Sequence, residues 1–95
     1  ENAWRFELDT SLLLGSTVTS LCGRDKGRNF VVIEIIDADY VYIADGRLRR
    51  VESPKRKKVK HISALARADE SGSVRIDVEN ITNNTLREFL SGLDG

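Results

Sequence analysis

Apolar and polar residues alternate along residues 17–62 with the two-residue period that is typical of β-strands. The segment 39–44 is the clearest case, because Val41 and Ile43 fall on one face and two tyrosines fall on the other. The predicted strands are residues 17–22, 29–36, 39–44, 47–51 and 59–62. Short strands with tight links favour a small, strongly bent barrel over an open sheet.

Glycines and one proline mark the predicted turns between these strands. Asp45-Gly46 is the strongest hairpin-turn dipeptide in the chain, and it predicts a tight turn before the fourth strand. Gly23 and Gly27 can supply the positive φ angles that a tight connection between the first two strands requires. Residues 52–58 contain the only proline of the chain and are predicted to form a loop.

Two segments flank the predicted barrel, which spans residues 14–62. Residues 1–13 predict an N-terminal arm or strand packed on the domain, since apolar side chains recur there at alternate positions. Residues 63–95 predict an acidic C-terminal extension with a polar linker, an alternating segment at 74–78 that fits a strand, and a short helix near 83–92. The predicted fold class is therefore mainly β, a barrel of about five strands with a short helical appendage.

The predicted helix carries signals at its start and along one face. Thr82 can cap its N-terminus, and Ile81 and Leu86 have the spacing of a hydrophobic staple. Apolar residues follow the i, i+3, i+4, i+7 rule at Leu86, Phe89, Leu90 and Leu93. A helix of about ten residues is marginal alone, so we expect this face to dock on another surface.

The charge distribution changes this picture, because a net charge of +0 conceals a basic segment. Residues 46–61 hold eight Lys or Arg residues against a single acid, Glu52, whereas residues 62–95 hold three against six acids. Basic residues also gather in the predicted turn at 23–28. Such a patch selects a polyanion or an acidic protein surface as its partner.

The basic groups are expected to share one side of a barrel that is only about 15–20 Å across by ordinary strand spacing. Taken alone, the run 53–61 fits a solvated face as well as polyanion binding, but the other basic groups favour the polyanion. Tyr40 and Tyr42 could add a stacking surface, although core filling fits one of them at least equally well. The candidate contact residues are Arg24, Lys26, Arg28, Arg47, Arg49, Arg50, Lys55, Arg56, Lys57, Lys58, Lys60 and His61. The surface that these residues are expected to form is called the basic face.

Catalytic and metal sites are not predicted. His61 and Cys22 are the only histidine and cysteine, which excludes a zinc site made of four such ligands. Cys22 fits a small buried hydrophobe at a strand end better than a nucleophile paired with His61. Asp37, Asp39 and Asp45 lie at the hairpin turns, where aspartate is favoured for turn chemistry alone. A small hydrolase is therefore a poor fit, and we expect no cofactor.

The stretch GRDKGRNF, residues 23–30, can be compared with a nucleotide-binding loop. A Walker-type loop has four residues between its glycines, then Lys and Ser or Thr, then a helix. Here three residues intervene, Arg28 and Asn29 follow, and a β segment comes next, so the pattern lacks the helix N-terminus that would hold phosphate. We interpret the stretch as a turn that presents charged side chains.

The sequence also bears on the compartment. It holds no run of 18 apolar residues that would span a membrane. The segment SLLLG is too short for a signal-peptide core. A single cysteine suits a reducing environment, so we expect a cytoplasmic protein without a membrane partner.

Several stretches carry a family resemblance when they are taken together in order. They are Gly15, Val18, GRDKGR, FVVIEIIDADYVYIADG and RRVESPKRKKVKH. Through them residues 14–62 resemble a KOW domain, and more narrowly the bacterial KOW-domain RNA-binding proteins that are similar to archaeal and eukaryotic large-subunit ribosomal proteins. Gly27 matches the invariant glycine of the family's strand–loop–strand unit.

The resemblance implies an SH3-like β-barrel, RNA binding and a role close to ribosomes or translation, without catalytic activity. It also implies that the loop with Arg24, Lys26 and Arg28 and the run 55–60 contact the RNA backbone. The acidic segment from Asp69 onward is not part of the KOW unit.

Two alternatives remain open from the sequence. SH3-like barrels also bind proteins, so the basic face could dock an acidic surface, and the helix with Leu86, Phe89 and Leu90 could occupy a partner's groove. The acidic extension could also fold back on the basic face as a mimic of RNA, since the two parts carry opposite charges.

Overall fold

The computed structural model describes residues 13–64 and 76–94, so the predicted N-terminal arm lies outside the described residues except for Leu13. Its elements are β1 (Thr17–Ser20), β2 (Asn29–Ile35), β3 (Tyr40–Ala44), β4 (Lys55–Lys58), the single-turn 3₁₀-helix η1 (Val59–His61), β5 (Ile62–Ala64) and α3 (Asn83–Asp94). The described part of the chain is therefore mainly β with one C-terminal helix, as the sequence predicts.

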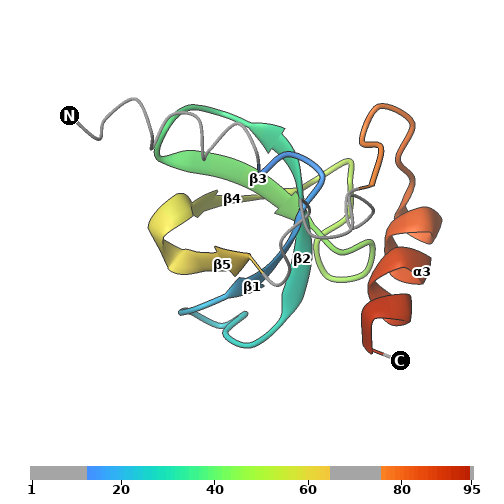
Figure 1. The fold of residues 1–95 in the computed structure, drawn as a ribbon, viewed down its shortest axis with the longest axis horizontal. Helices are drawn as coiled ribbons and strands as arrows, with labels where there is room; N and C mark the ends of the chain where they lie inside the picture. Colours follow the sequence, from blue (N-terminus) through green and yellow to red (C-terminus); the bar gives the residue numbers. More distant parts are fainter. Residues whose placement is uncertain (1–12, 65–75, 95) are drawn as a thin grey trace.

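The strands form one antiparallel sheet in the order β4-β3-β2-β1-β5. Figure 1 shows the sheet bending strongly, so that its two edge strands, β4 and β5, approach each other through the short turn η1. The edge strands do not pair with each other, and the barrel is therefore open along one seam. This order and curvature agree with the predicted small SH3-like barrel.

The apolar alternation places one hydrophobic core inside the bent sheet. Val41 and Ile43 are fully buried there, whereas Tyr40 and Tyr42 are half-buried on the opposite face, as predicted. The inner core is completed by Val18, Phe30 and Val32, with Leu13, Ile35, Val59 and Ile62 packed against it.

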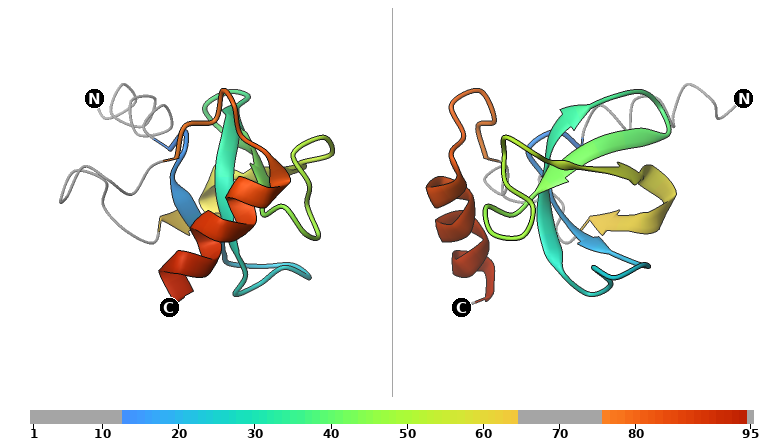
Figure 2. Two further views of the ribbon diagram at one scale, coloured as in Figure 1. Left: turned by 90° about the vertical axis from the view of Figure 1, so that its right-hand side faces the viewer. Right: turned by 180° about the vertical axis from the view of Figure 1, so that it is seen from behind.

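A second core lies on the outer face of β2, where α3 packs across the sheet (Figure 2). Val31 and Ala44 meet Leu86 and Leu90 of the helix in this cluster, and Ile33 packs against it. The register of β2 against β3 shifts between Val32 and Glu34, as at a β-bulge. Because both faces of β2 are covered, its sequence is an almost continuous apolar run.

The helix begins as predicted and ends two residues later, at Asp94. The Oγ1 of Thr82 accepts a hydrogen bond from the backbone N–H of Thr85 at 3.1 Å, which is the expected N-terminal cap. Ile81 and Leu86 pack in the same cluster, in agreement with a hydrophobic staple. Among the described residues, no helix is long and apolar enough to cross a membrane.

Three predictions about residues 47–62 are wrong. Residues 47–51 form a bend and a turn rather than a strand, β4 occupies part of the predicted loop, and η1 occupies most of the predicted last strand. The missing strand at 47–51 is explained by Asp45, whose Oδ1 accepts the backbone N–H groups of Arg47 and Arg49, both at 2.9 Å. The chain therefore turns over a wide loop, residues 45–54, instead of a two-residue hairpin.

The segment at 74–78, which fits a strand in the sequence, is not one where it is described. Residues 76–78 have no regular secondary structure, and Val74 and Arg75 lie outside the described residues. Ile76 donates its backbone N–H to the Gly15 carbonyl at 3.0 Å and packs against the second core. These contacts, together with the packing of Ile81 on the same core, return the chain to the barrel before the helix begins.

Candidate nucleic-acid interface

The first basic loop, residues 21–28, is a tight connection between β1 and β2. Gly23 and Gly27 have φ angles of +84° and +86°, which only glycine adopts without strain, so the predicted turn roles of these two residues are confirmed. The Lys26 N–H donates to the Gly23 carbonyl at 3.2 Å. The loop exposes Arg24, Lys26 and Arg28 to solvent.

Asp25 points the other way and joins three separate segments of the chain. Its side chain is 7% exposed, and its Oδ2 lies 3.3 Å from the Lys55 Nζ and 3.6 Å from the Arg49 Nη2. The same oxygen makes no directional hydrogen bond within the described residues, so these contacts are charge contacts. They hold the first loop against both the 45–54 loop and β4.

Lys57 makes a second link between the same elements. It is buried, with 7% exposure, and its Nζ donates to the carbonyl oxygen of Cys22 at 3.1 Å. In the register of β3 and β4 it lies opposite the buried Val41, and therefore on the inner face of the sheet. The predicted approach of the two basic segments is thus seen in the structure, and Lys55 and Lys57 hold them together.

The alternate residues of β4 project from the other face, over the tyrosines of β3. The Arg56 Cζ lies 4.7 Å from the centre of the Tyr40 ring, and the Lys58 Nζ lies 5.9 Å from it. Both distances are within the range of cation–π contacts. Tyr40 and Tyr42 stay half-exposed, so this face combines two cations with aromatic side chains.

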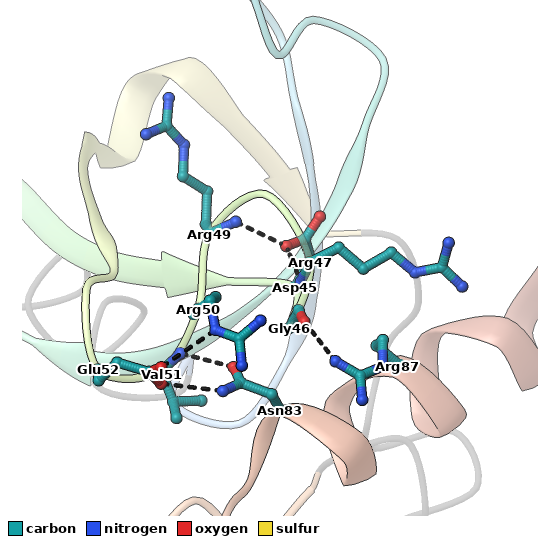
Figure 3. Close-up of polar contacts among 9 residues, drawn as sticks. All are labelled: Asp45, Gly46, Arg47, Arg49, Arg50, Val51, Glu52, Asn83 and Arg87. Carbon is teal, nitrogen blue, oxygen red and sulfur yellow. Dashed lines mark hydrogen bonds and ion pairs between the residues drawn. The ribbon is translucent and has the colours of Figure 1, made fainter.

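The 45–54 loop is fixed by the helix, as Figure 3 shows. Asn83 accepts the Val51 N–H through its Oδ1 at 2.8 Å and donates through its Nδ2 to the Glu52 Oε1 at 2.9 Å. Arg87 donates from its Nη1 to the Gly46 carbonyl at 2.7 Å. Sequence reasoning missed both helix residues, because nothing local links them to a loop more than thirty positions away.

Gly46 is required where the loop meets the helix. Its φ is +81°, and a Cβ at this position would clash with the Asn83 carbonyl oxygen. Glycine is therefore required at position 46 for two reasons, the positive φ angle and the close approach of the Asn83 backbone. The sequence predicted only the turn.

The charge of Arg50 is partly neutralised within the loop. Its Nε donates to the Glu52 Oε2 at 3.0 Å. Hydrogen bonds from Asn83 and Arg50 lower the pKa of Glu52 from 4.5 to about 2. Glu52 is therefore ionised at neutral pH at the edge of the basic face. Arg50 contributes less positive potential to this face than Arg47 does, because Arg47 is exposed and makes no ion pair within the described residues.

The turn η1 adds the last two predicted residues. Lys60 is exposed and His61 is half-buried. The His61 carbonyl accepts the Leu21 N–H at 2.8 Å, which ties η1 to the start of the first loop. The predicted contact residues therefore come from one connected set of elements.

Two of the three hairpin aspartates, Asp37 and Asp45, accept backbone hydrogen bonds, as the sequence predicts for turn residues. The Oδ1 of Asp37 accepts the backbone N–H groups of Asp39 and Tyr40 at 2.8 and 2.9 Å, as expected of turn chemistry. Cys22 is half-buried rather than buried. Within residues 13–64 and 76–94, no group of three or more His, Cys, Asp or Glu side chains is placed to hold a metal ion.

The acids of the C-terminal extension do not reach the basic face where they are described. Asp77, Glu79 and Glu88 are exposed, and none of them forms an ion pair with a base of the described barrel. The hydrogen bonds of the described extension to the 45–54 loop come from Asn83 and Arg87. Asp69 and Glu70 lie outside the described residues.

Comparison of the chain with models of protein families and with curated proteins gave no match. The resemblance to KOW domains therefore rests on the sequence residues that carry it, and the structure shows only a small, strongly bent β-sheet that is consistent with an SH3-like barrel.

Proposed function

We propose that this chain is a non-catalytic RNA-binding protein whose basic face contacts the phosphates of structured RNA, such as ribosomal RNA. One observation carries the proposal. Buried Asp25 holds Lys55 and Arg49 at 3.3 and 3.6 Å and so keeps three basic segments on one connected surface. Cations gathered on one surface raise its positive potential and attract polyanions, and the phosphate backbone of RNA is the polyanion that suits Arg and Lys together.

The basic residues divide into two roles in this proposal. Lys55, Lys57 and Arg49 make internal contacts and position the loops. The phosphate contacts come from bases that are exposed, namely Arg24, Lys26, Arg28, Arg47, Arg56 and Lys60. Lys58 and the tyrosines beside it offer a stacking surface for unpaired bases.

The setting of this activity follows from the family resemblance. KOW-like residues 14–62 on an SH3-like barrel support a place at the large ribosomal subunit or in translation. A cytoplasmic protein with no cofactor fits that setting, as does selectivity that comes from loop shape more than from base readout.

The test is fluorescence anisotropy of the full chain with several structured RNA fragments, including ribosomal ones. Replacing Arg56, Lys58 and Lys60 together with Gln should weaken binding to all the RNAs alike and reduce the salt slope by about 1 per lost phosphate contact. The matched control exchanges Arg56 for Lys and Lys58 for Arg, which keeps both charges and should leave the salt slope unchanged. Unchanged affinity of the Gln variant, or a loss confined to one RNA sequence, would refute the proposal.

A protein-interaction module is the second candidate, and Leu48 is the observation that favours it. This leucine is 59% exposed in the 45–54 loop, beside Arg47. An apolar tip among cations suits an acidic protein surface with a small hydrophobic pocket. The helix is a poorer docking element than the sequence suggests, because Leu86 and Leu90 pack on the barrel. A protein retained from RNase-treated lysate, and lost with Leu48→Ser, would favour this candidate.

A further inference from the structure

An open groove of about 410 Å³ lies where the first loop, the 45–54 loop and α3 meet. Arg28 lines it from the end of the first loop, Arg47 from the 45–54 loop, and Arg87 from the helix. Leu90 and Ser91 contribute the helix side of the lining, and Asp45 also lines it. The groove is within the range of about 300–1,000 Å³ that is typical of small-ligand pockets.

The charge of this arginine groove is not neutralised by the described residues. The ion pairs within them involve Arg49, Arg50 and Lys55, and not the three arginines of the groove. Asp45 is buried, and its Oδ1 already accepts two backbone N–H groups. Three guanidinium groups and one carboxylate give the groove a net positive charge, which attracts anions.

The three arginines also differ in how firmly they are held. Arg87 is anchored by its hydrogen bond to the Gly46 carbonyl at 2.7 Å, and Figure 3 shows Arg47 extending from the same loop. Arg28 and Arg47 are exposed. One anchored guanidinium group and two that can change position suit an anion with several acceptor oxygens. Each guanidinium group can donate two parallel hydrogen bonds to two oxygens of a phosphate.

We propose that the arginine groove binds the phosphate of one nucleotide of the RNA, with the sugar and base along Leu90 and Ser91. The inference rests on the proposed function and deepens it, since it assigns one position of the RNA to a built site. It also makes α3 part of the binding surface. The C-terminal extension then helps binding through Arg87, so deleting it weakens RNA affinity instead of relieving a mimic of RNA.

The groove is tested without RNA by titrating the ¹⁵N-labelled full chain with adenosine 5′-monophosphate and, separately, with inorganic phosphate. The arginine Nε–H signals of Arg28, Arg47 and Arg87 should shift and saturate. Replacing Arg28 and Arg47 with Gln should weaken the mononucleotide affinity at least about tenfold. The control replaces Arg24 and Lys26 with Gln, which removes the same charge from the first loop outside the groove, and should change the mononucleotide affinity less than about twofold.

Several outcomes would overturn the inference. They are equal losses in the two double variants, shifts that never saturate, and inorganic phosphate binding as tightly as the mononucleotide. Thermal melting of each variant checks that the fold is retained, and Arg87→Lys, which keeps the charge on the helix, should bind more tightly than Arg87→Gln.

An RNA arm separates the inference from the proposed function. A wild type that binds RNA, combined with a mononucleotide affinity that falls equally in the two double variants, would refute the groove and leave RNA binding intact. A wild type that binds the mononucleotide saturably but no RNA would refute the proposed function, and would identify the groove as a site for a free nucleotide.

Discussion

Replacing Asp25 with Asn tests how the basic face is held together. The change keeps the size of the side chain but removes the charge that faces Lys55 at 3.3 Å and Arg49 at 3.6 Å. It leaves the backbone contacts of the turn intact, including the Arg28 N–H donated to the Asp25 carbonyl. Any effect therefore reports the charge contacts.

The magnitude follows from distance and exposure. At an effective dielectric constant near 20, each contact is worth about 5 kcal/mol before desolvation. Burial of the carboxylate opposes this gain, and the cations are themselves 30% and 36% exposed, so most of it is cancelled. We expect a net loss of about 1–2 kcal/mol in the free energy of unfolding, which lowers the Tm by about 5–15 °C in a domain of this size.

The assay combines thermal melting with RNA anisotropy. Asp25→Asn makes the protein more positive, yet we expect weaker RNA binding, because Arg24, Lys26 and Arg28 are no longer held beside β4. The control is Glu88→Gln, which makes the same charge change at an exposed helix position without an ion pair in the described residues. It should leave the Tm unchanged and slightly tighten RNA binding. If Asp25→Asn behaves like this control, the basic segments do not depend on Asp25.

Other substitutions test the packing of the helix and its loop. Leu86→Ala should cost about 2–5 kcal/mol in urea unfolding, because Leu86 is fully buried in the second core; a loss below about 1 kcal/mol would mean the helix is not docked. Gly46→Ala should lower the Tm clearly, since the position needs φ of +81° and has no room for a Cβ. Because the pKa of Glu52 falls from 4.5 to about 2 on folding, its contribution to stability is present above pH 4.5 and is lost as the pH falls toward 2. Glu52→Gln should reduce the loss of unfolding free energy between pH 4.5 and pH 2. An unchanged pH dependence in this range would contradict the lowered pKa of Glu52.

The elements that alternation governs could be predicted from the sequence. Val41 and Ile43 set the faces of β3, and Thr82 with Leu86 set the start of the helix. The segment 47–58 could not be predicted, because its path depends on Asp45 capping its own loop and on Asn83 accepting the Val51 N–H. Local propensity carries no information about such a distant contact.

The candidate site, too, could be predicted only in part from the sequence. Charge clustering pointed to the two basic loops and β4, which Asp25 and Lys57 join in the structure. It could not assign Asp25 as the contact between Lys55 and Arg49, or separate inward Lys57 from outward Arg56, because both depend on the register of a strand that was predicted as a loop. Arg87 was missed because it lies in an extension, residues 62–95, that holds three basic residues against six acids.

The most direct test of RNA binding by the basic face is the salt dependence of the affinity. A structured RNA fragment is titrated with the wild-type chain across a series of salt concentrations. With four to six phosphate contacts, log affinity should fall linearly with log salt, with a slope of about −3 to −5. A slope near zero, or no binding at the lowest salt concentration, would contradict the proposed function.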